Sequence, residues 1–385
     1  PLIVITADRP PEWIDHGEGQ SMRQNKVYEN FIAGSFSFPM LDHPDALWQT
    51  GVMTNEAIHI AKLESKPVHL NFPFREPLYE TVKKPSKSAR KITHFKTKKQ
   101  LEENNLEELQ KIWNNCNKKM IICGSLNKDE DLNYQLNYLA KNESVIVLTE
   151  STSNLYNENF ISCIDRTLER IYGKPEFFPE TVITIGSSII SKKLKQLLRK
   201  YNPKHHWHVE DTRRAQDVFS SITHLIPIDP NQFFSQFYKN LKNKTSSTFR
   251  FSWKNEFDIS EKNHNLYLKN CEWSDLKAHG LIYDLIKNEN LNLQMGNSSS
   301  VRYIQLFKSL KNTTYKSNRG VSGIDGSSST AIGAAECTNK TTLLITGDLS
   351  FIYDQNSLWN NLLPSNLKII VINNQGGGIF NIIPG

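Results

Sequence analysis

Two short apolar runs near the end of this 385-residue chain constrain its fold more than any other feature. Residues 342–346 and 367–372 are rich in β-branched and aliphatic side chains, as in strands that are buried on both faces. Between them, residues 353–361 place apolar side chains at helical spacing. This order predicts a β-α-β unit with parallel strands. Both strands of such a unit end at the same edge of the sheet, where open α/β sheets bind ligands.

Polar residues follow both runs. Gly347-Asp348 comes directly after the first run, and Asn374 follows the second, 26 residues beyond Asp348. A carboxylate, an amide oxygen and a backbone carbonyl, which Gly376 can supply, are ligands that Mg²⁺ accepts when phosphate oxygens complete its shell. The glycines from Gly376 to Gly378 also let the backbone pass close to a bulky anion. Either dipeptide alone is more typical of a plain turn or a helix cap, but the two together at this spacing predict a Mg²⁺–diphosphate clamp.

The spacing of Gly-Asp and Asn-Asn resembles the diphosphate-binding signature of thiamine diphosphate enzymes. Leu349 differs from most of that superfamily, which has glycine at this position. The longer segments around these dipeptides, GDLSF and NNQGGGIF, are similar to those of one branch of the superfamily. This branch is the 2-succinyl-5-enolpyruvyl-6-hydroxy-3-cyclohexene-1-carboxylate synthases of menaquinone biosynthesis. Two more segments resemble the same branch, TADRPPE at residues 6–12 and SNRGVSGIDGS at residues 317–327.

The resemblance implies thiamine diphosphate and Mg²⁺, or Mn²⁺, as cofactors. Asp348, Asn374 and Gly376 are the predicted metal ligands, and Ile324 is expected to lie under the cofactor and enforce its bent form. For Asp325-Gly326 alone, a hairpin turn is the alternative. The cofactor-binding residues that the resemblance implies are Ser322, Gly323, Ile324, Asp325, Gly326, Gly347, Asp348, Leu349, Ser350, Asn374, Gly376, Gly377, Ile379 and Phe380.

The resemblance also implies a reaction: decarboxylation of 2-oxoglutarate and addition of the resulting succinyl-semialdehyde carbanion to isochorismate. Both substrates are polyanions, and an arginine can bind a carboxylate through two charge-assisted hydrogen bonds. The predicted catalytic residues are Arg9, Gln20, Arg302 and Arg319. The predicted substrate-binding residues are Arg9, Ser298, Arg302, Arg319, Ile379 and Phe380. For Arg9 a surface salt bridge is the alternative, and Gly19 stands where the family pattern has asparagine.

Alternating strands and helices over the remaining chain predict an α/β fold with three doubly wound parallel-sheet domains of the thiamine diphosphate-enzyme type, the first and last incomplete. The predicted segments are 1–80, the C-terminal part of a pyrimidine-binding-type domain; 81–105, a basic linker; 106–235, a middle α/β domain; 236–270, a polar and irregular linker; and 271–385, a truncated diphosphate-binding domain. Strands are expected at residues 2–5, which we expect to be buried, and at 67–74, 120–124, 145–148 and 181–186, with helices over 45–63 and 276–286.

Three histidines, His205, His206 and His208, have a spacing that a metal site could use. No carboxylate or cysteine accompanies them at ligand spacing, so a surface cluster on a strand is the favoured interpretation. Residues 83–99 carry eight basic side chains and no acidic one. Because aromatic residues are nearly absent from this run, it is interpreted as a solvated linker, with nucleic-acid binding as the alternative.

Composition predicts a cytoplasmic protein without a membrane span. The five cysteines lack a CxxC motif or a framework spacing, which favours reduced thiols. No apolar stretch approaches the roughly 20 residues that cross a bilayer. The expected partners are the small-molecule substrates and a second copy of the chain, as a homodimer or dimer of dimers, and no nucleic acid.

The ends of the chain carry a further expectation. The sequence starts inside a predicted core strand, and the resemblance places the glutamate that protonates the cofactor before Pro1. We therefore expect these 385 residues alone to be inactive and further residues to exist at both ends. Two other functions stay open at this point, namely another 2-oxo-acid decarboxylase or carboligase, and a non-catalytic α/β binding protein.

Overall fold

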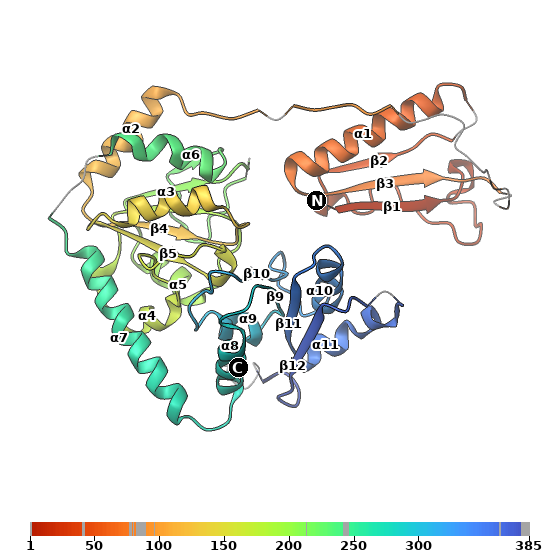
Figure 1. Cartoon of the computed structure of the whole chain (residues 1–385). Coiled ribbons are helices and arrows are strands. Elements are labelled where there is room, and N and C mark those ends of the chain that lie inside the picture. Colours follow the sequence, from red (N-terminus) through yellow and green to blue (C-terminus); the bar gives the residue numbers. More distant parts are fainter. Residues whose placement is uncertain are drawn as a thin grey trace. The chain divides into compact units, whose positions relative to one another are not determined.

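The computed structural model describes residues 2–40, 43–76, 79, 81, 90–95, 97–212, 214–241, 246–361 and 363–378. The chain divides into two compact units, Pro1–Lys98 (the first unit) and Lys99–Gly385 (the second unit). Over the described residues these units contain three sheets, and all strand pairs in the sheets are parallel. Figure 1 labels the helices and strands. The three parallel sheets confirm the predicted fold class.

The first unit contains a three-stranded sheet in the order β1-β3-β2. Its strands are β1 (Leu2–Asp8), β2 (Gly34–Ser37) and β3 (Pro67–Pro73), its helix is α1 (Ala46–Glu64), and its 3₁₀ turns span Pro11–Trp13 and Glu29–Phe31. Small residues on α1, Ala57 and Ala61, pack against Val68 and Leu70 of β3. The helix and the two strand positions agree with prediction.

The expectation that β1 is buried is wrong within this unit. Leu2 and Ile5 are 58% and 67% exposed. The physical reason is position: among the described residues of this unit, β1 pairs with β3 alone and lies at the edge of the sheet, whereas the central strand β3 buries Val68, His69, Leu70 and Asn71. An apolar run indicates a strand but does not reveal whether that strand is central.

The middle sheet has five strands in the order β5-β4-β6-β7-β8. They are β4 (Lys119–Cys123), β5 (Val145–Thr149), β6 (Thr181–Ile185), β7 (His205–Val209) and β8 (His224–Ile226). Strands β4, β5 and β6 are buried along their whole length and agree with the predicted core strands. Their continuous apolar runs follow from burial on both faces, since helices cover each side.

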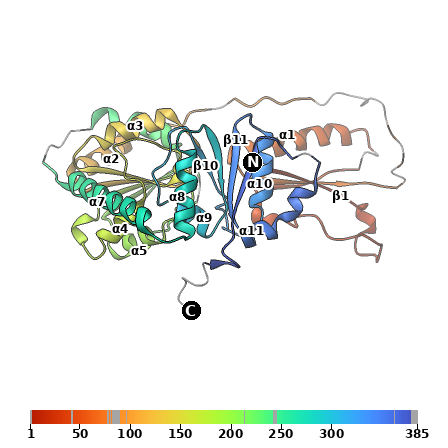
Figure 2. The same ribbon diagram turned by 60° about the horizontal axis from the view of Figure 1, so that its bottom comes forward.

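Helices form two layers around this sheet (Figure 2). One face packs against α2 (Glu103–Asn115), α3 (Glu130–Ala140) and α6 (Pro230–Phe237). The other packs against α4 (Ile164–Arg170), α5 (Lys192–Lys200) and α7 (Phe249–Asn270). Short 3₁₀ turns span Ser151–Ser153, Pro175–Phe177 and Tyr238–Asn240. The middle sheet is therefore doubly wound, as predicted.

The prediction of an irregular linker over residues 236–270 is wrong. Residues 249–270 form α7, a helix of 22 residues. Its buried residues Phe249, Trp253 and Phe257 recur every four residues and so form one stripe, which packs against the middle sheet and α4. Charged and amide residues around that stripe lower the average hydropathy, which is why the segment looked irregular in sequence. Phe251, on the opposite side of the helix from this stripe, is 76% exposed.

The prediction of a surface histidine cluster is also wrong. His206 and His208 are buried on the same face of β7, because residues two apart in a strand share a face. Thr184 Oγ1 lies 3.0 Å from His206 Nε2 and 2.9 Å from His208 Nδ1. Burial lowers the pKa of His206 to about 4. The pair is a hydrogen-bonded part of the core.

The third sheet has the order β10-β9-β11-β12. Its strands are β9 (Leu291–Met295), β10 (Thr314–Lys316), β11 (Thr341–Gly347) and β12 (Leu367–Ile372). Its helices are α8 (Asp275–Ile286), α9 (Ser299–Ile304), α10 (Ser327–Glu336) and α11 (Asp348–Tyr353), followed by a 3₁₀ turn over Gln355–Trp359. The predicted β-α-β unit is confirmed as β11, α11 and β12. Its helix begins at Asp348 and not at Tyr353, so the predicted helical span of 353–361 is wrong.

Among the described residues, no helix is both long and apolar enough to cross a membrane. The five cysteines are all free, and Cys116, Cys123 and Cys163 are buried.

Candidate functional site

The carboxyl ends of β11 and β12 lie side by side, because these strands pair in parallel from Thr342 with Leu367 to Gly347 with Ile372. Asp348 therefore starts α11 directly beside the loop that leaves β12. The backbone N–H of Gly376 donates to Asp348 Oδ2 at 2.8 Å, and that of Leu349 donates to Oδ1 at 2.8 Å. We call this end of the sheet, with Asp348, Asn374 and Gly376, the clamp edge.

Asn374 belongs to the same loop, but its amide is oriented differently. Its Nδ2 donates to Asp275 Oδ2 on α8 at 2.9 Å, and its Oδ1 accepts the Gly378 N–H at 3.2 Å. A Cβ at Gly378 would lie 2.8 Å from Asn374 Nδ2, so glycine at this position leaves room for the amide. Two of the three predicted metal ligands, Asp348 and Gly376, are therefore in direct contact. The third, Asn374, is hydrogen-bonded to Asp275.

The clamp edge fits a metal ion whose coordination shell is completed by phosphate oxygens. Its donors are one carboxylate with amide and carbonyl oxygens, which are hard ligands for Mg²⁺. In the described part of the chain no three His, Cys, Asp or Glu side chains gather into a metal site. A Cβ on Gly347 or Gly376 would meet no atom within 4 Å, so the backbone here borders open space. Gly376 and Gly377 have φ angles of 110° and 71°, a conformation that favours glycine.

The loop over residues 317–326 is tied to this edge. Ser350 Oγ, on α11, donates to the carbonyl oxygen of Ile324. Ser322 and Gly326 both have positive φ angles, and Gly326 is the N-cap of α10, so the alternative of a hairpin turn is wrong. Asp325 is exposed, whereas Gly323 and Ile324 are half-buried. The predicted cofactor-contacting loop and the clamp edge are therefore joined through Ser350 and Ile324.

Asn297 organises the other end of this loop, and no sequence motif singled it out. Its side chain is 2% exposed, and its Nδ2 donates to the carbonyl oxygens of Asn318 and Gly323, each at 2.7 Å. Its Oδ1 accepts from Arg319 Nη1 at 2.8 Å. One buried amide therefore fixes both the loop and the guanidinium of Arg319.

Arg302 and Arg319, which we call the arginine pair, lie close enough to affect each other. Arg302 Nη1 donates to the carbonyl oxygen of Ser298 at 2.7 Å. Burial lowers the pKa of Arg319, the positive charge of Arg302 lowers it further, and the charge of Glu150 opposes both. Arg319 Nε is buried without a hydrogen-bond partner among the described residues. Arg302 is exposed and Arg319 is half-buried, and neither forms an ion pair with a carboxylate among the described residues. An anion bound at Arg319 would be attracted more strongly than in water, because the guanidinium is partly desolvated.

Glu150 is a second residue that sequence reasoning missed. It follows β5 and is 1% exposed. Its carboxylate accepts from the backbone N–H of Ile190, at 2.9 and 2.8 Å, and from that of Ser191 at 2.7 Å. Burial raises the pKa of Glu150 to about 7, although these hydrogen bonds favour the ionised form. The sequence around a glutamate that follows a buried strand does not show whether its side chain is buried. The role of Glu150 therefore becomes visible only in the folded structure.

In the first unit the structure brings Arg9 and Gln20 together. Arg9 Nη2 lies 3.4 Å from Gln20 Oε1, and Nη1 forms an ion pair with Glu76 at 2.6 Å. The guanidinium carbon also lies 5.9 Å from the centre of the Trp13 ring. The ion pair with Glu76 is the contact that the salt-bridge alternative predicts. The roles that the resemblance implies, Arg9 at a substrate carboxylate and Gln20 near the reacting centre, stay predictions.

Some predicted residues lie outside the described part of the chain. These are Ile379 and Phe380, for the cofactor and substrate, and four members of the basic run, Lys83, Lys84, Lys87 and Lys96.

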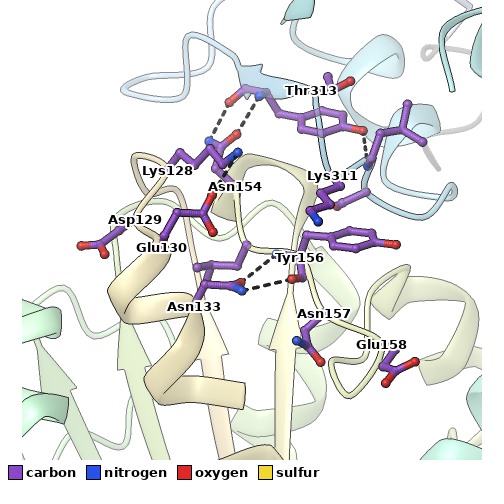
Figure 3. Close-up of a pocket in the computed structure, with 14 residues that line it drawn as sticks. Lys128, Asp129, Glu130, Asn133, Asn154, Tyr156, Asn157, Glu158, Lys311 and Thr313 are labelled. Carbon is purple, nitrogen blue, oxygen red and sulfur yellow. Dashed lines mark hydrogen bonds and ion pairs between the residues drawn. The ribbon is translucent and has the colours of Figure 1, made fainter. Parts of the chain in front are cut away.

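A polar pocket of about 380 Å³ lies between the middle and third sheets, and none of the predicted site residues lines it. Figure 3 shows its side chains. Asn133 exchanges two hydrogen bonds with the backbone of Tyr156, and Asn154 exchanges two with the backbone of Tyr315. Both amides are already hydrogen-bonded to backbone groups of the protein. We therefore interpret the pocket as part of the contact between the middle and third sheets.

Comparison with known proteins identifies the class. Residues 80–278 match a family described as "Middle domain of thiamine pyrophosphate". This match, with which the three parallel sheets agree, places the chain among the thiamine diphosphate enzymes.

Curated relatives define the branch. Proteins from Flavobacterium psychrophilum and Flavobacterium johnsoniae are 41% and 42% identical over 100% of this chain, and the alignment covers 69% of each relative. A protein from Porphyromonas gingivalis is 36% identical over 100% of the chain and 68% of its own length. All three are named 2-succinyl-5-enolpyruvyl-6-hydroxy-3-cyclohexene-1-carboxylate synthase. The chain belongs to this family of thiamine diphosphate-dependent transferases and spans about two thirds of these relatives' length.

Proposed function

We propose that the chain acts with thiamine diphosphate and Mg²⁺, or Mn²⁺, to decarboxylate 2-oxoglutarate and join the remaining four-carbon unit to isochorismate in menaquinone biosynthesis. The name shared by the relatives supports this reaction, because its succinyl group is what 2-oxoglutarate leaves after losing carbon dioxide. The enolpyruvyl and cyclohexene carboxylate parts of the same name correspond to a dicarboxylic acceptor such as isochorismate.

The observation that carries the proposal is the arginine pair. Asn297 holds Arg319 against the same loop that Ser350 joins to the clamp edge. Both substrates are dianions, and Arg319 has a buried Nε that lacks a hydrogen-bond partner among the described residues. In the proposal Arg302, Arg319 and Ser298 bind substrate carboxylates, and bidentate guanidinium contacts fix their orientation. Within the first unit, Arg9 would bind a substrate carboxylate, and Gln20 would lie near the reacting centre.

Asp348, Asn374 and Gly376 would hold the metal and through it the diphosphate. The segments 322–326 and 347–350, with Gly377, would line the cofactor. Thiamine diphosphate, when bound, supplies the electron sink that decarboxylation and carbon–carbon bond formation require. The residues of this chain then contribute binding, orientation and charge, and the burial around Arg319 strengthens each electrostatic contact.

The assembly and location are part of the same proposal. We infer a homodimer or dimer of dimers, since soluble oligomers are mostly symmetric homo-oligomers. The cytoplasm is the proposed compartment, which agrees with five free cysteines.

Two measurements test the proposed function. Calorimetric titration with thiamine diphosphate should show binding in Mg²⁺ that disappears when EDTA replaces the metal. Incubation of the holoenzyme with 2-oxoglutarate and isochorismate should release carbon dioxide and yield the coupled product by mass spectrometry. Metal-independent binding would contradict the clamp. Product formation from a different 2-oxo acid alone would contradict the substrate assignment.

A further inference from the structure

The sheet of the first unit carries a row of polar side chains on one face. Strands β1 and β3 run side by side (Figure 1), and Thr6 pairs with Asn71 in their register. Because residues two apart in a strand share a face, Asp8 lies on the same face as Thr6, and His69 on the same face as Asn71. Helix α1 packs against the other face, where Leu70 belongs to the apolar core. We call Thr6, Asp8, His69 and Asn71 the polar row.

The polar row is a continuous chain of hydrogen bonds. Asn71 Nδ2 donates to Asp8 Oδ2 at 2.7 Å, and Thr6 Oγ1 donates to Asn71 Oδ1 at 2.6 Å. Since the single hydroxyl proton of Thr6 is used there, His69 Nε2, at 2.7 Å, donates to Thr6 Oγ1. A carboxylate only accepts hydrogen bonds, so Asp8 sets the direction of the whole chain. Buried polar groups such as His69 and Asn71, 0% and 4% exposed, are costly unless hydrogen-bonded.

The other oxygen of Asp8 holds the loop over residues 9–33, which joins β1 to β2. Asp8 Oδ1 accepts from the backbone N–H of Arg9 at 2.9 Å. The same oxygen accepts from Gln24 Nε2 at 3.2 Å. The two oxygens of Asp8 thus divide their contacts, because Oδ2 binds the sheet and Oδ1 binds the loop. This loop carries both predicted substrate residues of the first unit, Arg9 and Gln20.

Two further contacts fasten the same loop close to the polar row. Gln24 Nε2 also donates to the carbonyl oxygen of Ala7 at 2.9 Å. The ring of Tyr28 lies edge-on to that of His69, with 5.0 Å between the ring centres. Gln20, four residues before Gln24, has a φ angle of 59°. A residue other than glycine keeps this left-handed conformation only where its surroundings hold it.

We propose that Asp8 is a positioning residue that holds Arg9 and Gln20 in the orientation that the substrate requires. This inference rests on the proposed function, in which Arg9 binds a substrate carboxylate. Asp8 suits this role because its carboxylate accepts from the loop and from the sheet at the same time. A displacement of about 1 Å in a substrate-positioning group can cost up to about 100-fold in rate, so a loosened loop should weaken substrate use.

The test compares Asp8→Ala with Asp8→Asn in the holoenzyme. Asp8→Ala removes the contacts of both oxygens and should raise the KM for 2-oxoglutarate or for isochorismate about tenfold. Asparagine keeps an oxygen for the Arg9 and Gln24 N–H groups but turns a second donor toward Asn71 Nδ2. Asp8→Asn should therefore keep KM within about threefold of the wild-type value while it lowers Tm. A role confined to stability would lower Tm in both variants without separating their KM values.

Gln24→Met tests the loop from its other side and leaves the sheet unchanged, so it decides the question if Asp8→Ala fails to fold. Methionine keeps the length of glutamine without its donor. KM should rise about three- to tenfold with little change in Tm, because Gln24 is only half-buried. Gln49→Met is the matched control, since Gln49 is exposed on α1 of the same unit, and it should leave KM unchanged.

The affinity for thiamine diphosphate separates positioning of the substrate loop from damage to the cofactor site. Its dissociation constant should stay within about twofold of the wild-type value in every variant, because Asp8 and Gln24 lie outside the segments proposed to hold the cofactor. Unchanged KM values in Asp8→Ala and Gln24→Met, beside an active wild type, would overturn the positioning role and leave the proposed function intact. An equal rise in KM in Asp8→Asn and Asp8→Ala would overturn it as well. A wild-type enzyme that couples neither acid would instead refute the proposed function.

Discussion

The clamp edge and the arginine pair belong to the same second unit but are built in different ways. The clamp edge lies within one β-α-β unit, in which β11, α11 and β12 are consecutive in sequence. The arginine pair draws Arg302 from α9 and Arg319 from the loop after β10, and Arg319 is held by Asn297, which follows β9. A site within one supersecondary unit leaves a spacing in the sequence. A site assembled from separate segments leaves none.

The largest expected effect tests the local character of the clamp edge. Asp348→Ala should remove measurable Mg²⁺-dependent binding of thiamine diphosphate, a loss of about 100-fold or more, because the metal loses its only carboxylate ligand. Asn374→Ala should weaken binding in the same direction. The Tm should change little, since Asp348 is only half-buried and bonded to backbone N–H groups. Calorimetry with and without Mg²⁺ measures the effect.

Asn373→Ala is the control for these two substitutions, since Asn373 is the exposed neighbour of Asn374. It should bind the cofactor as the wild type does. If Asp348→Ala retained wild-type affinity in Mg²⁺, the clamp edge would not be a metal site.

The second prediction addresses the arginine pair. Arg302→Ala and Arg319→Ala should each weaken substrate use by roughly 1.5–3 kcal/mol, about 10- to 150-fold in kcat/KM, because a charge-assisted contact is lost. Cofactor affinity should change far less. Lysine at either position should rescue poorly, since it lacks the planar fork that matches a carboxylate. A lysine variant with wild-type kinetics would show that charge alone suffices and would contradict this geometry.

The contrast between the two regions also explains what the sequence could predict. Strand ends such as Gly347-Asp348 were predicted correctly, because apolar runs and turn residues mark them locally. The helix α7 and its packing were not predicted, because its buried residues Phe249, Trp253 and Phe257 are separated by polar residues. Burial of β1 was overestimated because sequence does not show which strand is at an edge.

Residues that act through the fold were missed for a related reason. Asn297 and Glu150 are single polar residues after strands, and their partners lie 21 and 40 residues away. Nothing in their immediate neighbours distinguishes them from ordinary turn residues. By contrast, Arg302 and Arg319 were found through a family resemblance, and burial and the positive charge of Arg302 both lower the pKa of Arg319.

The third prediction concerns Asn297, which contacts both Arg319 and the loop that is joined to the clamp edge. Asn297→Ala should raise substrate KM about three- to tenfold and lower stability by about 1–3 kcal/mol, because buried carbonyl groups of Asn318 and Gly323 lose their donor. Asn297→Asp should also fail, since a carboxylate cannot donate to those carbonyls. Urea unfolding and steady-state kinetics measure the two effects. An Asn297→Ala enzyme with wild-type KM would show that Arg319 does not need this anchor.

The smallest expected effect concerns the charge of Glu150. Its pKa in the folded protein, about 7, exceeds the ordinary value of 4.5, so the folded state binds the proton more tightly than the unfolded state. The contribution of this carboxyl to stability is therefore complete below about pH 4.5 and is lost as the pH rises through 7. Between pH 5 and pH 8 the wild type should lose about 1–3 kcal/mol of unfolding free energy relative to Glu150→Gln.

Glutamine suits this experiment because its amide oxygen can still accept from the Ile190 and Ser191 N–H groups, while the side chain cannot ionise. Glu143→Gln is the control, since Glu143 is an exposed glutamate in the same domain, and its stability curve should run parallel to that of the wild type. Urea titrations at four pH values between 5 and 8 supply the free energies. If the Glu150→Gln and wild-type curves also ran parallel, the carboxyl would have the same proton affinity folded and unfolded. The Ile190 and Ser191 N–H groups, together with the positive charges of Lys195 and Arg319, would then stabilise its charged form enough to cancel the effect of burial.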